Sequence, residues 1–215
     1  MRWSREPGDH ASLARLIEDV GVSPRVVQAF RDVDRSYFVP AGTRETYADR
    51  PIGILEHQTT SQPSLIAHMI DAADVLPGDR VLEVGTGFGY QTALLAKLTG
   101  DVVSVERYAS ISAAARANLE RAGIEGVELV VGDGWKGVAD MAPYQAIIVS
   151  ASAEHLPDAL VAQLVEGGRL VIPLGVDHGD EVWLYIRRGD HAVRVRMLTP
   201  ARFVPLVPGE PQSNE

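Results

Sequence analysis

The sequence predicts an α/β fold with a doubly wound, mostly parallel sheet, N-terminal helices and a C-terminal antiparallel hairpin. Through the middle of the chain, short apolar segments rich in β-branched residues alternate with helical patterns, which is typical of right-handed βαβ units. The clearest strand is expected at residues 81–84. Glycines at positions 85, 87 and 89 predict a tight turn after it, and residues 91–98 follow a helical pattern. We expect the other elements to be arranged around this strand, turn and helix.

Two helices and a long loop are expected before this central unit. Apolar residues recur at helical spacing over 13–20, and Ser23 followed by proline is typical of the start of a second helix over 25–34. The loop is expected over 41–60, where glycine, threonine and charged residues are frequent. We expect the two helices to pack against the main part of the fold.

A third helix is expected to begin at Pro63. Proline suits the first turn of a helix, and Ser61 lies where a residue that caps the helix would be found. Serines that cap helices are far commoner than catalytic serines. The local pattern alone therefore favours a structural role for Ser61.

The elements after the central turn continue the alternation and then change pattern. Strands are expected at 102–106, 127–131, 146–149 and 168–175, and helices at 110–123 and 157–164. Two further strands, at 182–187 and 192–198, flank Gly189-Asp190 and predict an antiparallel hairpin. A polar segment that contains proline, residues 208–215, ends the sequence.

Composition excludes several classes of function. The 215 residues include no cysteine, so disulfides, thiol nucleophiles and zinc sites with cysteine ligands are excluded. The formal net charge is −9 and basic residues form no run, which argues against tight binding to the phosphate backbone of nucleic acids. No apolar run reaches the roughly 20 residues of a membrane span, and the N-terminus lacks an apolar signal segment. We expect a cytoplasmic protein.

The spacing of the glycines separates two classes of cofactor. A dinucleotide-binding turn has the pattern Gly-x-Gly-x-x-Gly, and its third glycine would stand at position 90. This chain has the bulky Tyr90 there, so NAD and FAD fit poorly. A phosphate-binding Gly-Lys-Ser or Gly-Lys-Thr sequence does not occur in the chain.

Polar residues at the ends of the predicted strands are expected to converge. In open parallel sheets, ligands bind beyond the carboxyl ends of the strands, so Glu83, Gly85, Glu106, Asp133 and Ser150 should meet at one crevice. Glu106 follows the glycines by about twenty residues, where an acid can accept hydrogen bonds from both ribose hydroxyls. Asp133 could bind an adenine amino group. The plainer interpretations are a solvated carboxylate for Glu106 and an Asx turn for Asp133.

In this order, the motifs resemble those of the Rossmann-like methyltransferases that use S-adenosylmethionine. They are Glu83, the Gly85-Thr86-Gly87-Phe88-Gly89 loop, Glu106 and Gly132-Asp133-Gly134. The resemblance implies a cofactor of S-adenosyl-L-methionine and no metal. It also implies cofactor contacts from Glu83, Gly85, Thr86, Gly87, Gly89, Glu106, Asp133 and Gly134.

Further motifs narrow the resemblance to the protein-L-isoaspartate (D-aspartate) O-methyltransferase family. They include Gln58-Thr59-Thr60-Ser61-Gln62-Pro63, Ala142-Pro143-Tyr144, the segment 163–175 and Arg202-Phe203-Val204-Pro205-Leu206. Val149-Ser150-Ala151 stands where methyltransferases that act on base amino groups have an Asn/Asp-Pro-Pro-Tyr/Phe sequence, and cytosine-C5 enzymes need a cysteine nucleophile. The two nucleic-acid chemistries therefore lose support.

The resemblance implies a reaction and a set of site residues. The reaction is methyl transfer to the carboxyl group of L-isoaspartyl residues in damaged proteins or peptides, after which the ester collapses to a succinimide and repair begins. The matching position makes Ser61 the active-site serine, a role that is compatible with capping because a helix start is an anion site. Contacts to the peptide are implied for Thr59, Thr60, Val204, Pro205 and Leu206.

Two departures from the family pattern keep alternatives open. Leu55-Glu56-His57 replaces a Gly-x-Gly sequence, and Gln145 stands where an aspartate is usual. One alternative is therefore a carboxyl methyltransferase of one dedicated peptide or partner protein. Another is a cofactor-binding module without catalysis, which would require the Ser61 loop to fold away from the methyl group.

The resemblance also bears on organisation and partners. We expect one methyltransferase domain over 1–215, with the N-terminal helices and substrate loop at 1–60, a Rossmann-like core at 61–207 and a tail at 208–215. The expected partners are proteins or peptides that carry isoaspartyl residues, with no nucleic acid and no membrane. We expect a monomer.

Overall fold

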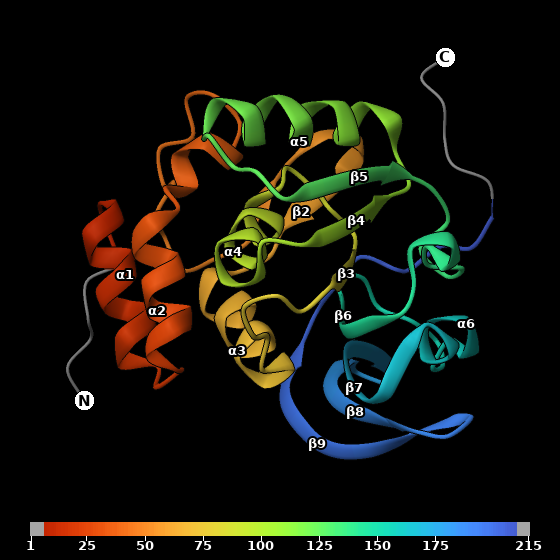
Figure 1. Cartoon of the computed structure of the whole chain (residues 1–215). Helices are drawn as coiled ribbons and strands as arrows, with labels where there is room; N and C mark the ends of the chain where they lie inside the picture. The colour runs from red at the N-terminus through yellow and green to blue at the C-terminus, as the bar shows by residue number, and fades with distance from the viewer. Residues whose placement is uncertain (1–6, 210–215) are drawn as a thin grey trace.

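The computed structural model describes residues 7–209, which form an α/β fold around a sheet of seven strands (Figure 1). The strand order is β5-β4-β3-β6-β7-β8-β9. Strands β3 to β7 pair in parallel, and β7, β8 and β9 pair antiparallel, which confirms the predicted mixed sheet and hairpin. The strands are β3 (Val81–Val84), β4 (Val102–Glu106), β5 (Val127–Val131), β6 (Tyr144–Val149), β7 (Leu164–Val176), β8 (Gly179–Arg188) and β9 (His191–Ala201).

Helices flank the sheet, and a two-stranded ribbon lies in the loop before α3. In Figure 1, α1 and α2 lie side by side at the left, next to α3 and α4. The α-helices are α1 (His10–Asp19), α2 (Pro24–Asp32), α3 (Pro63–Ala73), α4 (Tyr90–Thr99), α5 (Ala109–Arg121) and α6 (Asp158–Ala162). The 3₁₀ helices are η1 (Arg35–Phe38), η2 (Leu55–His57) and η3 (Ala139–Met141), and the ribbon consists of β1 (Ile52–Gly53) and β2 (Thr59–Thr60).

The central strands are buried on both faces, as parallel strands covered by helices must be. Successive residues of β6 alternate between two cores: Ala146 and Ile148 pack in the core under α1 to α4, and Ile147 and Val149 pack in the core that includes residues of α6. All four residues of β3 are buried. This double burial explains why the strands appear in the sequence as continuous apolar segments.

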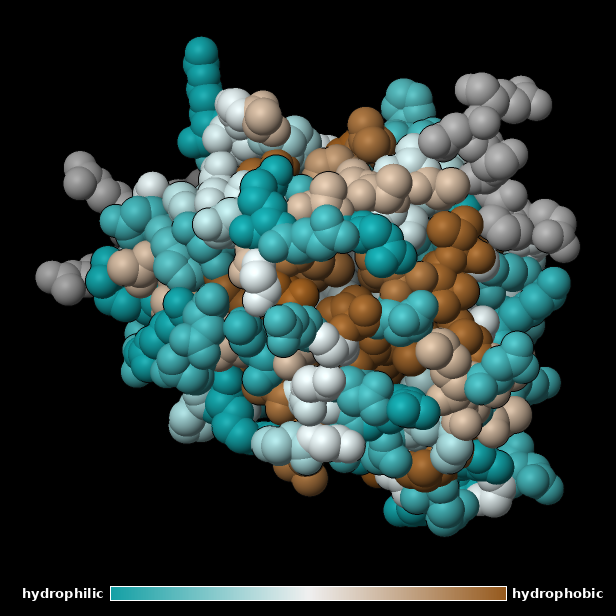
Figure 2. Space-filling view, turned by 45° about the horizontal axis from the view of Figure 1, so that its top comes forward, coloured by the Kyte–Doolittle hydropathy of each residue, from teal (hydrophilic) through white to brown (hydrophobic). Residues whose placement is uncertain are grey.

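The polar surface is interrupted by an apolar area. On the face shown in Figure 2, hydrophilic side chains surround a central region of hydrophobic residues. Among the exposed large apolar side chains, Val193, Val195 and Met197 lie on the edge strand β9. Within residues 7–209, no helix is both long enough and apolar enough to cross a membrane.

Helix α6 and strand β7 meet at a different position from the one predicted. Helix α6 is shorter than the predicted 157–164, and β7 begins at Leu164 rather than at position 168. Tyr144 pairs with Leu164 and Ala146 pairs with Arg169, so the pairing skips the residues between these two positions. Gly167, at φ 75°, permits this irregularity because a glycine tolerates positive φ. Because glycine is uncommon inside strands, Gly167 and Gly168 led the sequence analysis to place the start of β7 too late.

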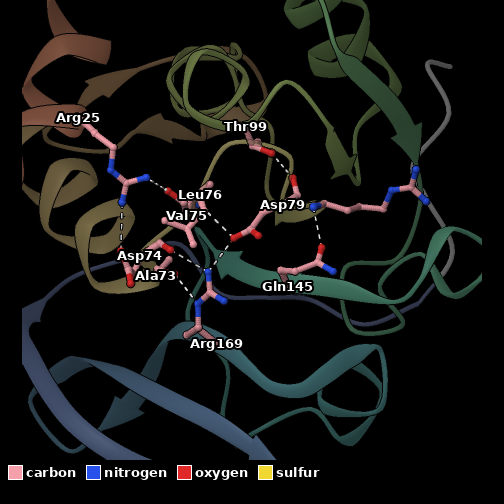
Figure 3. A network of polar contacts seen from close by, with 10 residues as sticks. Arg25, Ala73, Asp74, Val75, Leu76, Asp79, Thr99, Gln145 and Arg169 are labelled. Atoms are coloured by element: carbon pink, nitrogen blue, oxygen red, sulfur yellow. Dashed lines mark hydrogen bonds and ion pairs between the residues drawn. The ribbon is translucent and has the colours of Figure 1, made fainter.

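A polar network around Arg169 joins three segments at the amino ends of β3 and β6 (Figure 3). The guanidinium donates to the carbonyl oxygens of Ala73 and Asp74, both at 2.8 Å, and to Oδ2 of Asp79 at 2.9 Å. The first two acceptors lie at the carboxyl end of α3, where helix carbonyls lack partners within the helix. Arg169 thus attaches α3 and the turn before β3 to β7.

Gln145 belongs to the same end of the sheet. The side-chain Oε1 of Gln145 accepts a hydrogen bond from the Arg80 backbone N–H at 2.7 Å (Figure 3). The backbone N–H of Gln145 donates to the Arg80 carbonyl at 2.9 Å. Because ligands of parallel sheets bind at the carboxyl ends of the strands, this departure from the family pattern lies at the opposite edge. The neutral amide of Gln145 therefore bonds to the Arg80 backbone at one edge of the sheet and leaves the ligand-binding edge unchanged.

Glu83 joins β3, β4 and α4 through a carboxylate that is fully buried. Its Oε1 accepts a hydrogen bond from Gln91 Nε2 at 3.0 Å, and its Oε2 accepts from Ser104 Oγ at 2.6 Å and from the Thr92 hydroxyl. Burial raises the pKa of Glu83 to about 7, although the three donors favour the ionised form. The bonds from α4 to Glu83 therefore connect the two elements, β3 and α4, between which the glycine turn lies.

We expect Arg169→Met to lower the free energy of unfolding by about 2–3 kcal/mol, because hydrogen bonds from a charged group to partly buried acceptors are lost. The measurement is urea denaturation at pH 7. The control is Arg31→Met, which removes an ion pair to Glu18 whose side chains are 47% and 58% exposed, and should change stability by less than about 1 kcal/mol. Equal losses in the two variants would contradict the role given to Arg169.

We expect the stability of Glu83→Gln relative to the unsubstituted protein to increase with pH. Below pH 4.5 the glutamate is neutral in both states, whereas between pH 4.5 and 7 the unfolded chain loses a proton that the folded chain retains. The free energy of unfolding of the unsubstituted protein therefore falls by up to about 3 kcal/mol over this range, and the amide cannot ionise. Urea denaturation at a series of pH values measures the difference. A difference that does not vary with pH would show that the folded-state pKa is not raised.

Candidate active site

A cavity of about 200 Å³, here called the first cavity, lies at the carboxyl ends of β3, β4 and β6. Three segments that are distant in sequence form its walls: the glycine turn, the loop around β2 and the segment after β9. It brings together eleven residues that the sequence singled out, namely Thr59, Thr60, Ser61, Gly85, Thr86, Gly87, Glu106, Gly134, Val204, Pro205 and Leu206. Ser150 also lines it, as expected, whereas Glu83, Gly89 and Asp133 do not.

The glycine turn requires glycine at each of its three positions. Gly85, Gly87 and Gly89 have φ values of 95°, 53° and 92°, which L side chains rarely adopt. Gly89 is the N-cap of α4, and a Cβ there would lie 3.4 Å from the side chain of Leu119. Gly89 therefore permits close packing of α5 against the turn, while Gly85 and Gly87 present backbone to the cavity.

Glu106 ends β4 and presents its carboxylate to the glycine turn. Oε2 accepts from the Gly87 backbone N–H at 3.0 Å, and Oε1 accepts from the Tyr108 N–H at 3.1 Å. The residue is only 7% exposed, and burial raises the pKa of its carboxyl group while the backbone donors oppose the shift. Each oxygen keeps a lone pair for a further donor. The carboxylate can therefore accept two hydroxyl groups of one ligand.

Asp133 lies behind the wall of the cavity. Its Oδ1 accepts from the Trp135 N–H and its Oδ2 from the Gly209 N–H, both at 3.0 Å. The bond to Trp135 makes Asp133 part of an Asx turn, which was one of the two interpretations of its sequence. The next residue, Gly134, lines the cavity, and a Cβ there would lie 2.6 Å from the Val84 side chain. The cavity wall is therefore backbone at this point, and adenine recognition by the Asp133 carboxylate stays a prediction.

Ser61 does not cap α3. The N-cap is Gln62. The backbone N–H of Ser64, which has no partner within the helix, donates to Asp49 Oδ1 at 2.8 Å. Asp49 Oδ2 accepts in turn from Gln62 Nε2 at 2.9 Å. Asp49 lies fourteen residues before Pro63 in the loop, so the local pattern could not identify this cap. Within residues 7–209, the Ser61 hydroxyl has no hydrogen-bond partner in the protein and is available to a ligand.

A buried arginine holds the Ser61 loop in place. Arg35 is fully buried in η1, and its guanidinium donates to the Ala48 carbonyl at 2.7 Å and to the Arg50 carbonyl at 3.0 Å. It also donates to Thr60 Oγ1 at 3.2 Å and to the Ser61 carbonyl at 3.4 Å. No carboxylate lies within ion-pair distance of Arg35 among the described residues, so these neutral acceptors hold its two terminal nitrogens, whereas its buried Nε has no partner. The sequence analysis missed both Arg35 and Asp49.

The altered Leu55-Glu56-His57 segment packs against α5. Glu56 and His57 have φ values of 55° and 56°, the left-handed region that glycines adopt freely, and Glu56 Oε1 accepts from Ser110 Oγ at 2.8 Å. Ile54 and Gln58, on either side, line the first cavity. His57 thus keeps a positive φ without a glycine. The departure from the family pattern therefore lies beside the first cavity, and its three residues are not part of the cavity lining.

The segment after β9 completes the wall opposite Ser61. The Ser152 N–H donates to the Val204 carbonyl at 2.8 Å, and the Leu206 N–H donates to the Ser152 carbonyl at 2.7 Å. The segment therefore runs beside the chain that leaves β6, which brings residues 204–206 to the cavity. Gln91 of α4 lines the cavity too and was missed by the sequence analysis, because its position in the helix pattern indicates burial alone.

The cavity combines a backbone cradle, an acidic strand end and a hydroxyl without a protein partner. Within the described part of the chain, no cluster of three or more histidine, aspartate or glutamate side chains could hold a metal ion. Because the Ser61 loop and the glycine turn line the same cavity, the loop is not folded away from the turn. The arrangement therefore lacks the feature that a binding module without catalysis would require.

Comparisons with known proteins point to one family. A family model described as protein-L-isoaspartate(D-aspartate) O-methyltransferase matches residues 10–211. A protein-L-isoaspartate O-methyltransferase of Methanoculleus marisnigri is 46% identical over 184 residues, which are 85% of this chain and 83% of the relative. One of Anaeromyxobacter dehalogenans is 45% identical over 198 residues, which are 90% of this chain and 95% of the relative.

Solved structures with the same fold bear the same name. One protein-L-isoaspartate O-methyltransferase structure superposes with a TM-score of 0.85 at 31% identity, covering 94% of this chain and 67% of that chain. A Plasmodium falciparum protein described as a candidate member, in complex with S-adenosyl-L-homocysteine, superposes with a TM-score of 0.82 at 25% identity and covers 94% and 99%. The family-model match and these identities show that the chain belongs to the protein-L-isoaspartate(D-aspartate) O-methyltransferase family.

Proposed function

We propose that this chain methylates the free α-carboxylate of L-isoaspartyl residues in damaged proteins and peptides, and that Ser61 and Glu106 have separate roles in the reaction. The activity is that of its family, and the cofactor is S-adenosyl-L-methionine. The observation that carries the proposal is that a serine hydroxyl without a protein partner lines the same cavity as the glycine turn.

The residues of the cavity fit the cofactor. Gly85 and Gly87 bring backbone within reach of a ligand, and Glu106 has acceptor capacity for the two ribose hydroxyls. Gly134 lines the cavity next to Asp133 in sequence, and we place the adenine edge at this point. Bound in this place, S-adenosylmethionine supplies an electrophilic methyl group on a positively charged sulfonium, which the carboxylates nearby attract.

The methyl acceptor needs no general base. A peptide α-carboxylate is ionised at neutral pH, so the protein has only to hold it in line with the methyl group and keep water away. We assign the first task to the Ser61 hydroxyl, which donates a hydrogen bond to one carboxylate oxygen. Thr59 and Thr60 extend this wall, and Val204, Pro205 and Leu206 face the peptide from the segment after β9.

The positive end of α3 contributes little to this step. Its first-turn N–H at Ser64 already binds the Asp49 carboxylate, so an anion is in place at the helix start. Binding of the substrate carboxylate therefore depends on Ser61 and on the backbone that Arg35 fixes. The methyl ester then leaves the enzyme and closes to a succinimide, whose hydrolysis returns some of the residue to normal aspartate.

We further propose that the chain acts as a single-domain monomer in the cytoplasm. The glycine turn, the loop around β2 and the segment after β9 all line the first cavity, which supports a site built within one subunit. The alternative of one dedicated protein target was suggested by the altered segment 55–57. Because Glu56 of that segment bonds to Ser110 and none of its three residues lines the first cavity, its change gives the alternative little support.

The proposed reaction is tested with paired synthetic peptides that differ only in an aspartyl or isoaspartyl linkage. With S-adenosylmethionine labelled in the methyl group, we expect base-labile label on the isoaspartyl peptide alone, because only that linkage presents a free α-carboxylate. Label on the aspartyl peptide as well would contradict isoaspartyl selectivity. Label on neither would refute the reaction for general peptides.

We expect Ser61→Ala and Glu106→Gln to affect different steps. Loss of the Ser61 hydroxyl should lower kcat by about 10- to 100-fold and leave the Kd of S-adenosylhomocysteine within about twofold, whereas Glu106→Gln should raise that Kd by about tenfold or more. Calorimetric titration and peptide kinetics measure the two effects, and each variant is the control for the other. Equal loss of cofactor affinity in both variants would refute the division of roles.

A further inference from the structure

A second, larger cavity adjoins the first on the side of α3 and the segment after β9. Its volume is about 430 Å³, which is within the range of sites that hold small ligands. It shares Thr59, Ser61, Ser150 and Val204 with the first cavity. The two cavities therefore meet at the serines, and a group placed in the second cavity lies next to the position where a methyl acceptor would bind.

The second cavity has an unusual charge for this protein. The residues that line it include two ionisable ones, His68 of α3 and Arg202, and no aspartate or glutamate. The whole chain has 29 acidic and 20 basic residues, so an average surface would favour carboxylates. Both side chains are exposed to solvent, and Arg202 has no ion-pair partner within residues 7–209.

Two carboxylates bond to residues of the lining, and the protein's own donors occupy both. Asp49 accepts from Gln62 Nε2 and from the Ser64 N–H. Asp180 of β8 accepts from the Ser152 hydroxyl and from the Phe203 N–H at 2.7 Å. These carboxylates fix the walls of the second cavity, and Arg202 remains as a cation without a fixed counter-ion.

We propose that the second cavity binds an acidic side chain that neighbours the isoaspartyl residue, so that the enzyme prefers isoaspartyl sites with a nearby glutamate or aspartate. The inference rests on the proposed function and names a substrate class for it. Successive residues of an extended peptide are about 3.3 Å apart, so a residue one or two positions from the methyl acceptor can reach the adjoining cavity. Arg202 is the residue that determines the preference, because it supplies the free positive charge.

The experiment compares isoaspartyl peptides that carry glutamate, glutamine or lysine at each of the two positions before and after the isoaspartyl residue. Steady-state methyl transfer is measured at low salt with the full chain. At one or more positions we expect glutamate to lower KM by about fivefold relative to glutamine, and lysine to raise it, with kcat unchanged. Because exposed charges are screened, about 0.5 M salt should reduce the preference.

Two variants locate the preference in the cavity. In Arg202→Gln the KM ratio between glutamine and glutamate peptides should fall to about 1, while KM for the glutamine peptide stays within about twofold. Arg196→Gln, which removes the same charge from an exposed position of β9 outside the cavity lining, should keep the full ratio. A ratio that survives in Arg202→Gln, or that is lost in Arg196→Gln, would overturn the assignment.

The outcomes also separate this inference from the function on which it rests. Methyl transfer to all isoaspartyl peptides with equal KM would overturn the charge preference and leave the proposed function standing. No transfer to any of the peptides would overturn both. Transfer that favours glutamate in the unsubstituted protein and not in Arg202→Gln supports both.

Discussion

The fold and the site depend on one buried carboxylate, that of Glu83. A buried carboxyl group is costly to ionise, and three donors from β4 and α4 offset part of this cost and fix these two elements against β3. The glycine turn lies between β3 and α4, so its backbone path follows from this arrangement. Thr86, in the turn, adds a contact of 2.6 Å between its hydroxyl and that of Ser104. A residue that resembles a cofactor ligand in sequence therefore acts beneath the cavity, as the support of the residues that line it.

The N-terminal segment supplies the other half of the site, and Tyr90 attaches it to the core. The Tyr90 ring packs edge-on against Phe30 with centroids 5.9 Å apart and lies 5.8 Å from the Phe38 ring. The guanidinium of Arg35 lies 5.8 Å from the same ring. The bulky residue that argued against a dinucleotide site is thus one of the contacts that join the helices before residue 40, and Arg35 with them, to the core.

Much of the fold could be predicted because its signals are local. Parallel strands buried on both faces appear as continuous apolar segments, and Gly189-Asp190 marked the hairpin correctly. The site was predicted in part, because Glu106 and the glycine turn have fixed spacing in the chain. Asp49 and Arg35 could not be found in this way. They act through contacts with residues that lie 13 to 26 positions away, and no periodic pattern records such contacts.

By itself, the sequence determined the α/β class, the order of the strands along the chain, the class of cofactor and the resemblance to the family, since each depends on residue type and spacing. The tertiary structure decided which of the marked residues reach the cavity. It placed Glu83 below the floor and Asp133 behind the wall, put Gln145 at the amino ends of the strands, and left the Ser61 hydroxyl without a partner. The physical reason is that a side chain has several possible partners of similar strength, and only the packing of distant segments determines which one it meets.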